Sequence, residues 1–385
     1  MEKISDNSRL TFFEASSIIV GHGVGAGILS VPYLASRNSL RETLLVLLFC
    51  FAFNVVLHLI IAELSYNNKG AQFVSCLDAE LFSGKIKKVL TWFAFIMLGL
   101  SVVFNVSAFL TGAAAVFSSW LGLSRTAGML IFYVLGAGVV FVGLKLVGIC
   151  EKIAVGSMVG VVLLLLIATL RSEISPLPGG WHGIGNALAL FSMISFSLSA
   201  VMSTPQVVKG LDGDVKKIRA AIVTGLLVNA CIILLITVMT LIGVGDAITQ
   251  NGALVDLSNR LGVWVSIVGY VFTLLALATS FWANTLNLRD IVNEQTQLGE
   301  RMSWLAASLP CLIIAFFGLN TFVGLTRFAS VIQVLTGLGI IVAYHLSRRR
   351  VGHSHIIGAF GSLPFQILVA LCSVLATVGA LVPVK

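Results

Sequence analysis

The sequence is poor in charge and in the motifs that mark most catalytic sites. Charged residues make up only 10% of its 385 residues. It contains no HExxH sequence, no cluster of acids within an apolar segment, and no GxxxxGK loop. These absences argue against an intramembrane protease and an ATP-driven pump, so we expect no enzymatic activity. A channel is also disfavoured, because no segment offers residues of one polar type that would form a ring around a pore.

Cysteines are few and widely spaced. The six, with no CxxC pair among them, are Cys50, Cys76, Cys150, Cys231, Cys311 and Cys372. This spacing indicates neither a disulfide framework nor a cysteine metal site. The apolar run that follows residues 1–10 carries Glu14 and has no small-residue cleavage site, so we expect no signal peptide.

Apolar residues are what the sequence has in excess. They make up 58% of the chain, and the mean hydropathy is +1.03. No soluble domain buries that much apolar surface, so the composition predicts an all-α polytopic membrane protein in contact with the lipid bilayer. Eleven apolar spans can be placed, at about residues 11–36, 42–67, 88–121, 126–145, 150–170, 185–210, 216–243, 260–290, 301–318, 322–346 and 357–383.

Lysine and arginine are divided unevenly between the two sides of these spans. With the N-terminus in the cytoplasm, 17 of the 24 basic residues fall on the cytoplasmic side. The positive-inside rule therefore predicts a cytoplasmic N-terminus and an extracytoplasmic C-terminus at Lys385, in the cell (inner) membrane. The same bias accounts for the formal net charge of +8 without a nucleic-acid partner. Nothing in the sequence specifies an oligomeric state.

The spacing of the spans predicts an internal repeat. Spans one to five and six to ten begin at corresponding places, offset by about 172 to 175 residues. Because five is odd, the second copy enters the membrane from the opposite side, which is an inverted repeat. The first copy covers residues 11–171, the second covers 185–346, and span 357–383 is an addition outside the repeat. The same offset aligns the LSVP sequence at 29–32 with the MSTP sequence at 202–205.

The sequence GHGVGAG at 21–27 predicts a break in the middle of span one. Glycine costs about 1 kcal/mol relative to alanine in a helix interior, so we expect two half-helices joined by extended backbone. The N–H groups of Gly25, Ala26 and Gly27 would face a carboxylate, and the carbonyls near Gly21 and Val24 would face a cation. The alternative is close helix packing through small residues.

The corresponding stretch of span six, 195–199, is rich in serine and predicts a second break. Interrupted segments at matching places in two halves are typical of a transporter's substrate site. Facing half-helix ends suit a zwitterion, so the predicted ligand is an amino acid. The predicted substrate-binding residues are Gly23, Gly25, Ala26, Gly27, Asn105, Ser195, Phe196, Ser197 and Ser199. Phe196 suits a pocket or gate as well as plain packing, and Asn105 suits substrate binding or a hydrogen bond between helices.

Two further polar residues are candidates for a proton-carrying or gating role. His22 stands in the predicted break and is of a residue type that titrates near neutral pH, although a fixed, hydrogen-bonded ring is an equal alternative. Glu63 lies near the cytoplasmic end of span two, where burial is costly unless it pairs with a basic residue.

Four segments together resemble the amino acid permeases of the amino acid, polyamine and organocation superfamily. They are VGAGILSVPY in span one, AELSY at the end of span two, SFSLSAVMSTPQVVKGLDGDVKKIRAAI in span six and LALATSFWANTLNLRDIV in span eight. The similarity is closest to the aromatic amino acid permeases and the amino acid/auxin permeases. It implies the five-plus-five inverted repeat of the leucine transporter, with substrate between spans one, three, six and eight. The chain departs from these relatives in lacking a histidine after the Ser-Phe of span six and a proline after span two.

The resemblance also implies a cation site. In the leucine-transporter fold, residues matching Ala276, Thr279 and Ser280 join carbonyls matching Gly21 and Val24 to hold sodium. Bacterial aromatic amino acid permeases carry a similar sequence and use protons. The spans show neither a mid-depth acid nor a lysine at the centre of span five, which argues against a proton, and His22 argues for one. We therefore predict amino acid import by cation symport, with the proton ahead of sodium and no cofactor beyond that sodium ion. The alternative is an amino acid sensor or exchanger on the same fold.

Overall fold

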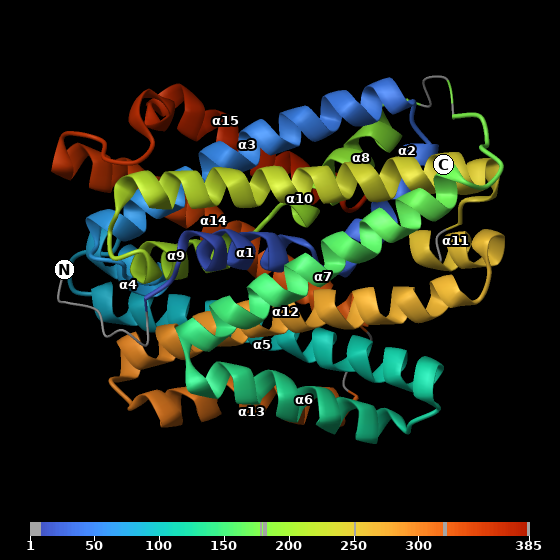
Figure 1. Ribbon diagram of the computed structural model, residues 1–385. Helices are drawn as coiled ribbons and strands as arrows, with labels where there is room; N and C mark the ends of the chain where they lie inside the picture. The colour runs from blue at the N-terminus through green and yellow to red at the C-terminus, as the bar shows by residue number, and fades with distance from the viewer. Residues whose placement is uncertain (1–8, 178, 180–182, 250–251, 319–321, 383–385) are drawn as a thin grey trace.

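The protein is a bundle of helices, described here by a computed structural model that covers residues 9–177, 179, 183–249, 252–318 and 322–382. Within these residues every regular element is helical (Figure 1). The elements are α1 (Phe12–Gly23), η2 (Ala26–Ser30), α2 (Val31–Ser36), α3 (Leu40–Asn67), α4 (Phe73–Glu80), α5 (Lys87–Leu121), α6 (Arg125–Val142), α7 (Leu144–Leu170), α8 (Ile184–Ser197), η3 (Val201–Ser203), α9 (Thr204–Gly210), α10 (Val215–Val244), η4 (Gly245–Ala247), α11 (Ala253–Leu261), α12 (Trp264–Thr296), α13 (Glu300–Phe316), α14 (Phe322–Val351), η5 (Gly358–Gly361) and α15 (Leu363–Gly379).

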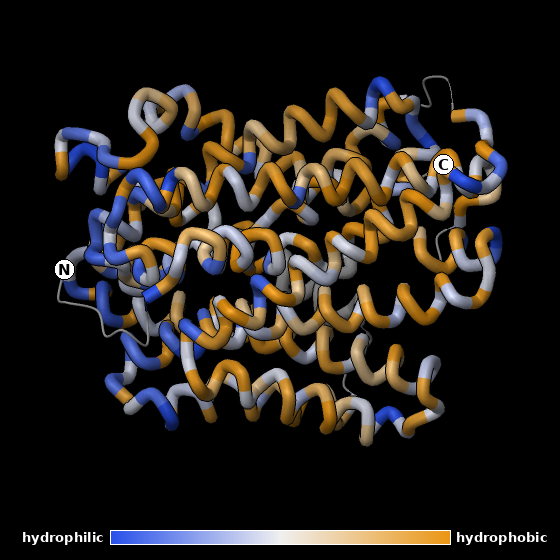
Figure 2. The backbone as a smooth tube through the Cα atoms, viewed as in Figure 1, coloured by the Kyte–Doolittle hydropathy of each residue, from blue (hydrophilic) through white to orange (hydrophobic). Residues whose placement is uncertain are grey.

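The arrangement is that of a multi-pass membrane protein, as the composition predicted. Polar residues gather at both ends of the bundle and apolar residues fill the region between them (Figure 2). Seven helical segments are long and apolar enough to cross a bilayer, and a bent pair, Phe12–Gly23 with Gly27–Ser36, makes an eighth. Helices α13, α14 and α15 occupy the last three predicted spans, and α13 and α15 have only 17 residues each. The total of eleven spans stays a prediction.

Capping boxes set the starts of the first two long helices. Thr11 and Glu14 bond each other reciprocally at the start of α1, and Ser39 and Glu42 do the same at the start of α3. Each box satisfies two of the N–H groups that a helix leaves without partners at its first turn. Both starts lie close to the predicted boundaries at 11 and 42.

Helix α1 lies inside the bundle against α7, α10 and α12 (Figure 1). A glycine permits the close approach of α10: a Cβ on Gly225 would lie 2.7 Å from Ile19 Cβ and 2.8 Å from the carbonyl of Ser16. Small residues at such a crossing let two backbones pack directly in a membrane. The inner half of the broken span is therefore enclosed by three long helices.

The helix predicted as an addition outside the repeat, α15, packs along α8 and α14. The hydroxyl of Ser192 in α8 donates to the carbonyl of Ala376 over 2.6 Å. A Cβ on Gly379 would overlap the carbonyl of Leu188, so the two backbones are in direct contact there. Helix α15 is thus attached to the first half of the broken span six.

Two short helices were not predicted. Helix α4 follows α3 and has 8 residues, and α11 follows η4 and has 9 residues. Both are shorter than a membrane span, and their mixed composition gives no long apolar run. The carboxylate of Asp256 in α11 accepts hydrogen bonds from the N–H and the hydroxyl of Thr249, at 2.9 Å and 2.8 Å.

Candidate substrate and ion site

The first helix break lies where the glycine-rich sequence predicted it. Helix α1 ends at Gly23 and η2 begins at Ala26, so Val24 and Gly25 form the link. The N–H of Gly25 donates to the carbonyl of Gly23 over 2.8 Å, so the prediction that this N–H is free was wrong. The N–H groups of Ala26 and Gly27 open η2, where the first donors of a helix have no intrahelical acceptor. These two groups can still receive a carboxylate.

The second break lies at residues 198–200, between the end of α8 and the start of η3. It is held from α3 by His58, whose Nε2 accepts the N–H of Ala200 at 2.9 Å. The other ring nitrogen of His58, Nδ1, is 2.7 Å from the carbonyl of Asn54 and donates to it. His58 therefore links the backbone of α3 to the second break.

The helix ends beside the two breaks contact each other through Gly27, Phe196 and Ser197. A Cβ on Gly27 would lie 2.9 Å from Phe196 Cδ1 and 3.3 Å from Ser197 Oγ. The Ser197 hydroxyl is buried and has no hydrogen-bond partner among the described residues. Phe196 is 54% exposed, so its ring borders Gly27 without being enclosed. An unpaired hydroxyl and a loosely held aromatic ring beside an open helix end form a suitable place for a polar ligand with an apolar side chain.

Asn229 of α10 joins both breaks and was not predicted from the sequence. Its side-chain N–H group donates to the carbonyl of Ser197 over 2.8 Å, while its carbonyl oxygen is buried without a partner among the described residues. A Cβ on Gly23 would overlap the Asn229 amide, so the glycine is needed for this contact. A polar residue within an apolar span was the signal that could have identified it.

The predicted cation site is partly assembled, and it contains an acid that the sequence analysis missed. Gly21 packs against Thr279 of α12, with 2.9 Å between a Cβ on Gly21 and Thr279 Cβ. The same Cβ would overlap the carboxylate of Glu151, which comes from α7. The hydroxyl of Thr279 donates to the carbonyl of Ala276 over 3.0 Å. The prediction that the spans lack a mid-depth acid was wrong.

The remaining cation-site residues lie around the same junction. Ser280 Oγ would be 3.4 Å from a Cβ on Gly25. Val24 is fully buried and its N–H donates to the carbonyl of Val20 over 2.8 Å. The only atoms that these residues offer as cation ligands are oxygens, which suit a hard cation. The described residues contain no group of three or more His, Cys, Asp or Glu side chains that would hold a transition metal.

His22 belongs to the last turn of α1 and not to the non-helical link. Its Nδ1 is 2.7 Å from the hydroxyl of Ser203, and its Nε2 is 3.4 Å from the side-chain nitrogen of Asn284. The ring therefore bridges η3 and α12, and both of its nitrogens have a neighbour. This is the fixed, hydrogen-bonded alternative that the sequence analysis had left open.

The four remaining predicted residues make other contacts. Ser195 turns toward α3, with its hydroxyl 3.3 Å from Cys50 Sγ. The backbone N–H of Ser199 donates to the carbonyl of Phe196 over 3.0 Å. Asn105 is half-buried in α5 and forms no side-chain hydrogen bond among the described residues. Glu63 pairs with no basic residue in the described chain; its carboxylate instead accepts hydrogen bonds from residues 354–357.

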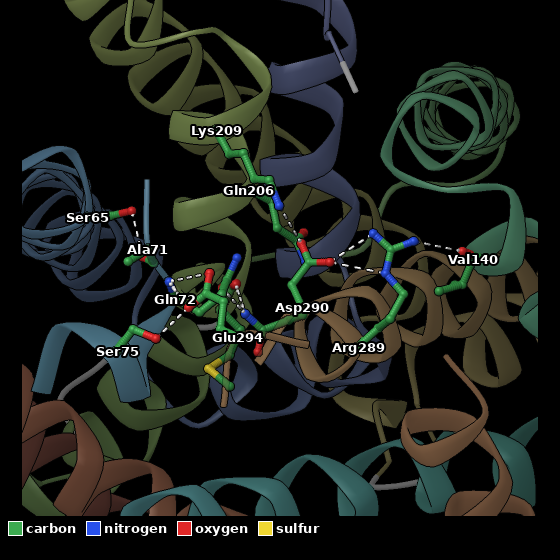
Figure 3. A network of polar contacts seen from close by, with 12 residues as sticks. Ser65, Ala71, Gln72, Ser75, Val140, Gln206, Lys209, Arg289, Asp290 and Glu294 are labelled. Atoms are coloured by element: carbon green, nitrogen blue, oxygen red, sulfur yellow. Dashed lines mark hydrogen bonds and ion pairs between the residues drawn. The ribbon is translucent and has the colours of Figure 1, made fainter. Parts of the chain in front are cut away.

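A buried polar network closes one end of the bundle beside the breaks (Figure 3). The guanidinium of Arg289 donates to Asp290 over 2.8 Å and to the carbonyl of Val140 in α6 over 3.4 Å. Lys209 of α9 lies 3.8 Å from the other oxygen of Asp290. The Asp290 and Arg289 side chains are 6% and 9% exposed, so the pair is sealed from solvent. This network links α9, the second half of the broken span six, to α6 and α12.

The same network continues to α4. The carboxylate of Glu294 accepts hydrogen bonds from the N–H of Gln72 at 3.0 Å and the hydroxyl of Ser75 at 2.6 Å. Asn287 donates to the side chain of Gln72 over 2.8 Å and to the carbonyl of Met202 over 2.9 Å. The short helix α4 is therefore attached to η3 and α12 at this end. These pairings join residues about 85 to 222 positions apart, so no local sequence pattern could have identified them.

Comparison with known proteins finds one matching family and several similar structures. The tryptophan/tyrosine permease family matches residues 9–378. Among solved structures, that of MhsT in complex with L-phenylalanine is similar, with a TM-score of 0.67 and 15% identity over 97% of this chain and 99% of that one. The manganese transporter of Eremococcus coleocola, in complex with an aromatic bis-isothiourea substituted compound, has a TM-score of 0.61 and 14% identity over 96% of this chain and 85% of that one. No curated protein sequence matches the chain. Both structural similarities support the predicted leucine-transporter type of fold.

Proposed function

The chain belongs to the tryptophan/tyrosine permease family, and from this premise we propose that it imports an aromatic amino acid by cation symport through alternating access. Membership of this family makes it an amino acid transporter and not an enzyme. The observation that carries the proposal is the meeting of the two helix breaks at Gly27, Phe196 and Ser197.

The geometry supports an amino acid as substrate. The N–H groups of Ala26 and Gly27 stand at a positive helix end and suit the carboxylate of the substrate. The carbonyl end of α8, at Ser197, stands opposite and suits its ammonium group. The partly exposed ring of Phe196 offers an aromatic face for the side chain. MhsT, which shares the fold, was solved with L-phenylalanine bound.

The coupling ion that we propose is a proton, with sodium as the second candidate. A cation is favoured in either case, because Gly21, Thr279 and Glu151 bring oxygen atoms and an acidic group together in a site closed to solvent. We propose a cytoplasmic N-terminus in the cell membrane, on the positive-inside bias of the sequence. The C-terminal Lys385 lies outside the described residues.

Uptake by purified protein in sealed vesicles tests the proposal. Labelled tryptophan, tyrosine and phenylalanine would be offered beside leucine and glutamate, under an imposed pH gradient or an imposed sodium gradient. We expect accumulation of at least one aromatic amino acid under one of the two gradients. Gly27→Val is the negative control, because the valine side chain would occupy the space between Gly27 and the ring of Phe196. Saturable binding of an aromatic amino acid without uptake under any gradient would instead indicate a sensor.

A further inference from the structure

Among the buried acids of the described chain, Glu151 is the one whose charge is compensated by no hydrogen bond and no ion pair. It lies in α7 and is 0% exposed, and neither oxygen of its carboxylate has a hydrogen-bond partner among the described residues. No basic side chain in this part of the chain forms an ion pair with it. An unpaired buried carboxylate costs several kcal/mol, so such groups within a membrane bundle are rarely kept without a function.

The other buried acids of the described chain, and the partly buried Glu294, are all compensated. Each either pairs with a basic side chain or accepts several hydrogen bonds. These acids are Glu14 with Lys145, Asp290 with Arg289, Glu63 with residues 354–357, Glu294 with Gln72 and Ser75, and Asp256 with Thr249. The absence of partners at Glu151 is therefore a property of this site and not of acids in the bundle generally.

The position of Glu151 adds a second, independent observation. Its carboxylate occupies the space that a side chain at Gly21 would need, and Thr279 borders the same space. Gly21 lies two residues before the end of α1, where the carbonyls of a helix run out of intrahelical donors. The carboxylate therefore points at the junction of α1, α7 and α12, beside the last turn of α1, which precedes the break after Gly23.

A purely structural role does not account for this arrangement. A permanently protonated carboxyl group would still carry an O–H donor that needs an acceptor, and no hydrogen bond of the described residues includes either oxygen of Glu151. A permanently charged one would need a counter-ion. A cation that enters the site from outside during the transport cycle supplies the charge that the ionised carboxylate needs.

We propose that the Glu151 carboxylate is the group that receives the coupling cation, either a proton or a sodium ion. This inference rests on the proposed symport function and specifies where the ion acts. The cation neutralises the carboxylate and so lets the inner half of span one, α1, pack against α7 around Gly21. When the cation leaves on the other side, the restored charge opposes that packing. The ion thereby favours one of two conformations by its differential affinity for them.

Two neutral replacements of Glu151 test the proposal. Glu151→Gln keeps the size of the side chain, and Glu151→Met removes its polarity, which favours folding because no buried polar group is left unpaired. With a tenfold gradient of a singly coupled cation, wild-type vesicles can accumulate substrate up to about tenfold. We expect both variants to equilibrate substrate, to an accumulation ratio near one, while exchange of labelled for unlabelled substrate continues.

Lys152→Gln is the matched control. It removes a charge from the neighbouring position of the same helix, where the side chain is exposed, and we expect gradient-driven accumulation at the wild-type level. Imposing the pH gradient and the sodium gradient separately on the wild type identifies which cation Glu151 receives. Accumulation above the external concentration by either folded Glu151 variant would overturn the proposal. If the wild type itself exchanges substrate but accumulates it under neither gradient, the proposed symport function is wrong, and the assignment of Glu151 is wrong with it.

Discussion

Replacing Glu63 with alanine is expected to destabilise the protein through a segment that lies nearly three hundred residues away in the chain. The Glu63 side chain is fully buried in α3. Its carboxylate accepts hydrogen bonds from the hydroxyl of Ser354 at 2.7 Å and from the backbone N–H groups of His355, Ile356 and Ile357 at 3.2, 3.3 and 2.9 Å. One carboxylate therefore fixes the whole connection between α14 and η5.

The size of the effect follows from how many donors lose their acceptor. Ile356 and Ile357 are 0% and 4% exposed, so water does not readily replace the carboxylate at their N–H groups. Each buried donor left unsatisfied costs about 1–3 kcal/mol, which gives about 2–6 kcal/mol for Glu63→Ala. Glu63→Gln keeps one acceptor oxygen, and we expect about half of that loss. Ser354→Ala removes a hydroxyl that donates to Glu63 and accepts the N–H of Gly358. Because Ser354 and Gly358 are partly exposed, water can replace the hydroxyl there, and the change should cost only about 0.5–1.5 kcal/mol.

Thermal unfolding of the purified protein in detergent would rank the three variants. We expect the midpoint to fall most for Glu63→Ala, less for Glu63→Gln and least for Ser354→Ala, with substrate exchange retained in each variant below its midpoint. An unchanged midpoint for Glu63→Ala would refute the reasoning. A loss of exchange without a loss of stability would restore the gating role that the sequence suggested for Glu63.

Three further outcomes are expected. Gly27→Ala should lower aromatic amino acid uptake by about 10- to 200-fold and more than Gly25→Ala, because a Cβ at 27 meets the Phe196 ring at 2.9 Å, whereas one at 25 meets Ser280 at 3.4 Å. Burial acts to raise the pKa of Glu80, but hydrogen bonds from Arg350, Asn68 and Ser347 outweigh it and lower that pKa below its usual 4.5. The Glu80 carboxylate therefore stabilises the fold above pH 4.5, and this contribution is lost as the pH falls further. Thermal unfolding in detergent should therefore show a smaller acid-induced loss of stability for Arg350→Gln than for the wild type. A tag that carries a reactive cysteine after Lys385 should be labelled by a reagent added outside intact cells.

Each of these outcomes has a clear contradiction. Equal uptake by the Gly27 and Gly25 variants would mean that Phe196 is not part of the substrate site. An acid response that is the same with and without the Arg350 side chain would mean that the Glu80 pair does not contribute to stability. Labelling of the C-terminal tag only after the cells are made permeable would contradict the odd number of spans.

The break in span one and the start of the long helices were predictable because their causes are local. Four glycines within residues 21–27 disfavour a helix wherever they occur, and Thr11 with Glu14 forms a cap that depends on neighbouring residues alone. The apolar spans followed from composition in the same way. These features do not depend on which helix packs beside which.

Glu151 was missed because the boundary of its helix was misplaced. The sequence placed the start of span five at 150, beside Lys152, where an acid reads as a surface residue. In the structure Gly143, with a φ of 120°, joins α6 to α7 directly, and α7 begins at Leu144. Glu151 therefore lies two turns inside the helix. Asn229 and His58 were missed as parts of the site for another reason, since their partners in the second break become neighbours only when distant helices pack.

The attachment of α15 to α8 makes the two broken spans mechanically unequal. In an ideal inverted repeat, the half-helices α1 and α8 would exchange roles between the outward- and inward-open states at equal cost. Here α8 is joined to a 17-residue helix outside the repeat through Ser192 and the contact at Gly379, whereas α1 packs against α7, α10 and α12. Any tilt of α8 must move α15 through the lipid with it. On the proposed alternating-access mechanism, we therefore expect the two open states to differ in energy even when substrate and ion concentrations are equal on the two sides.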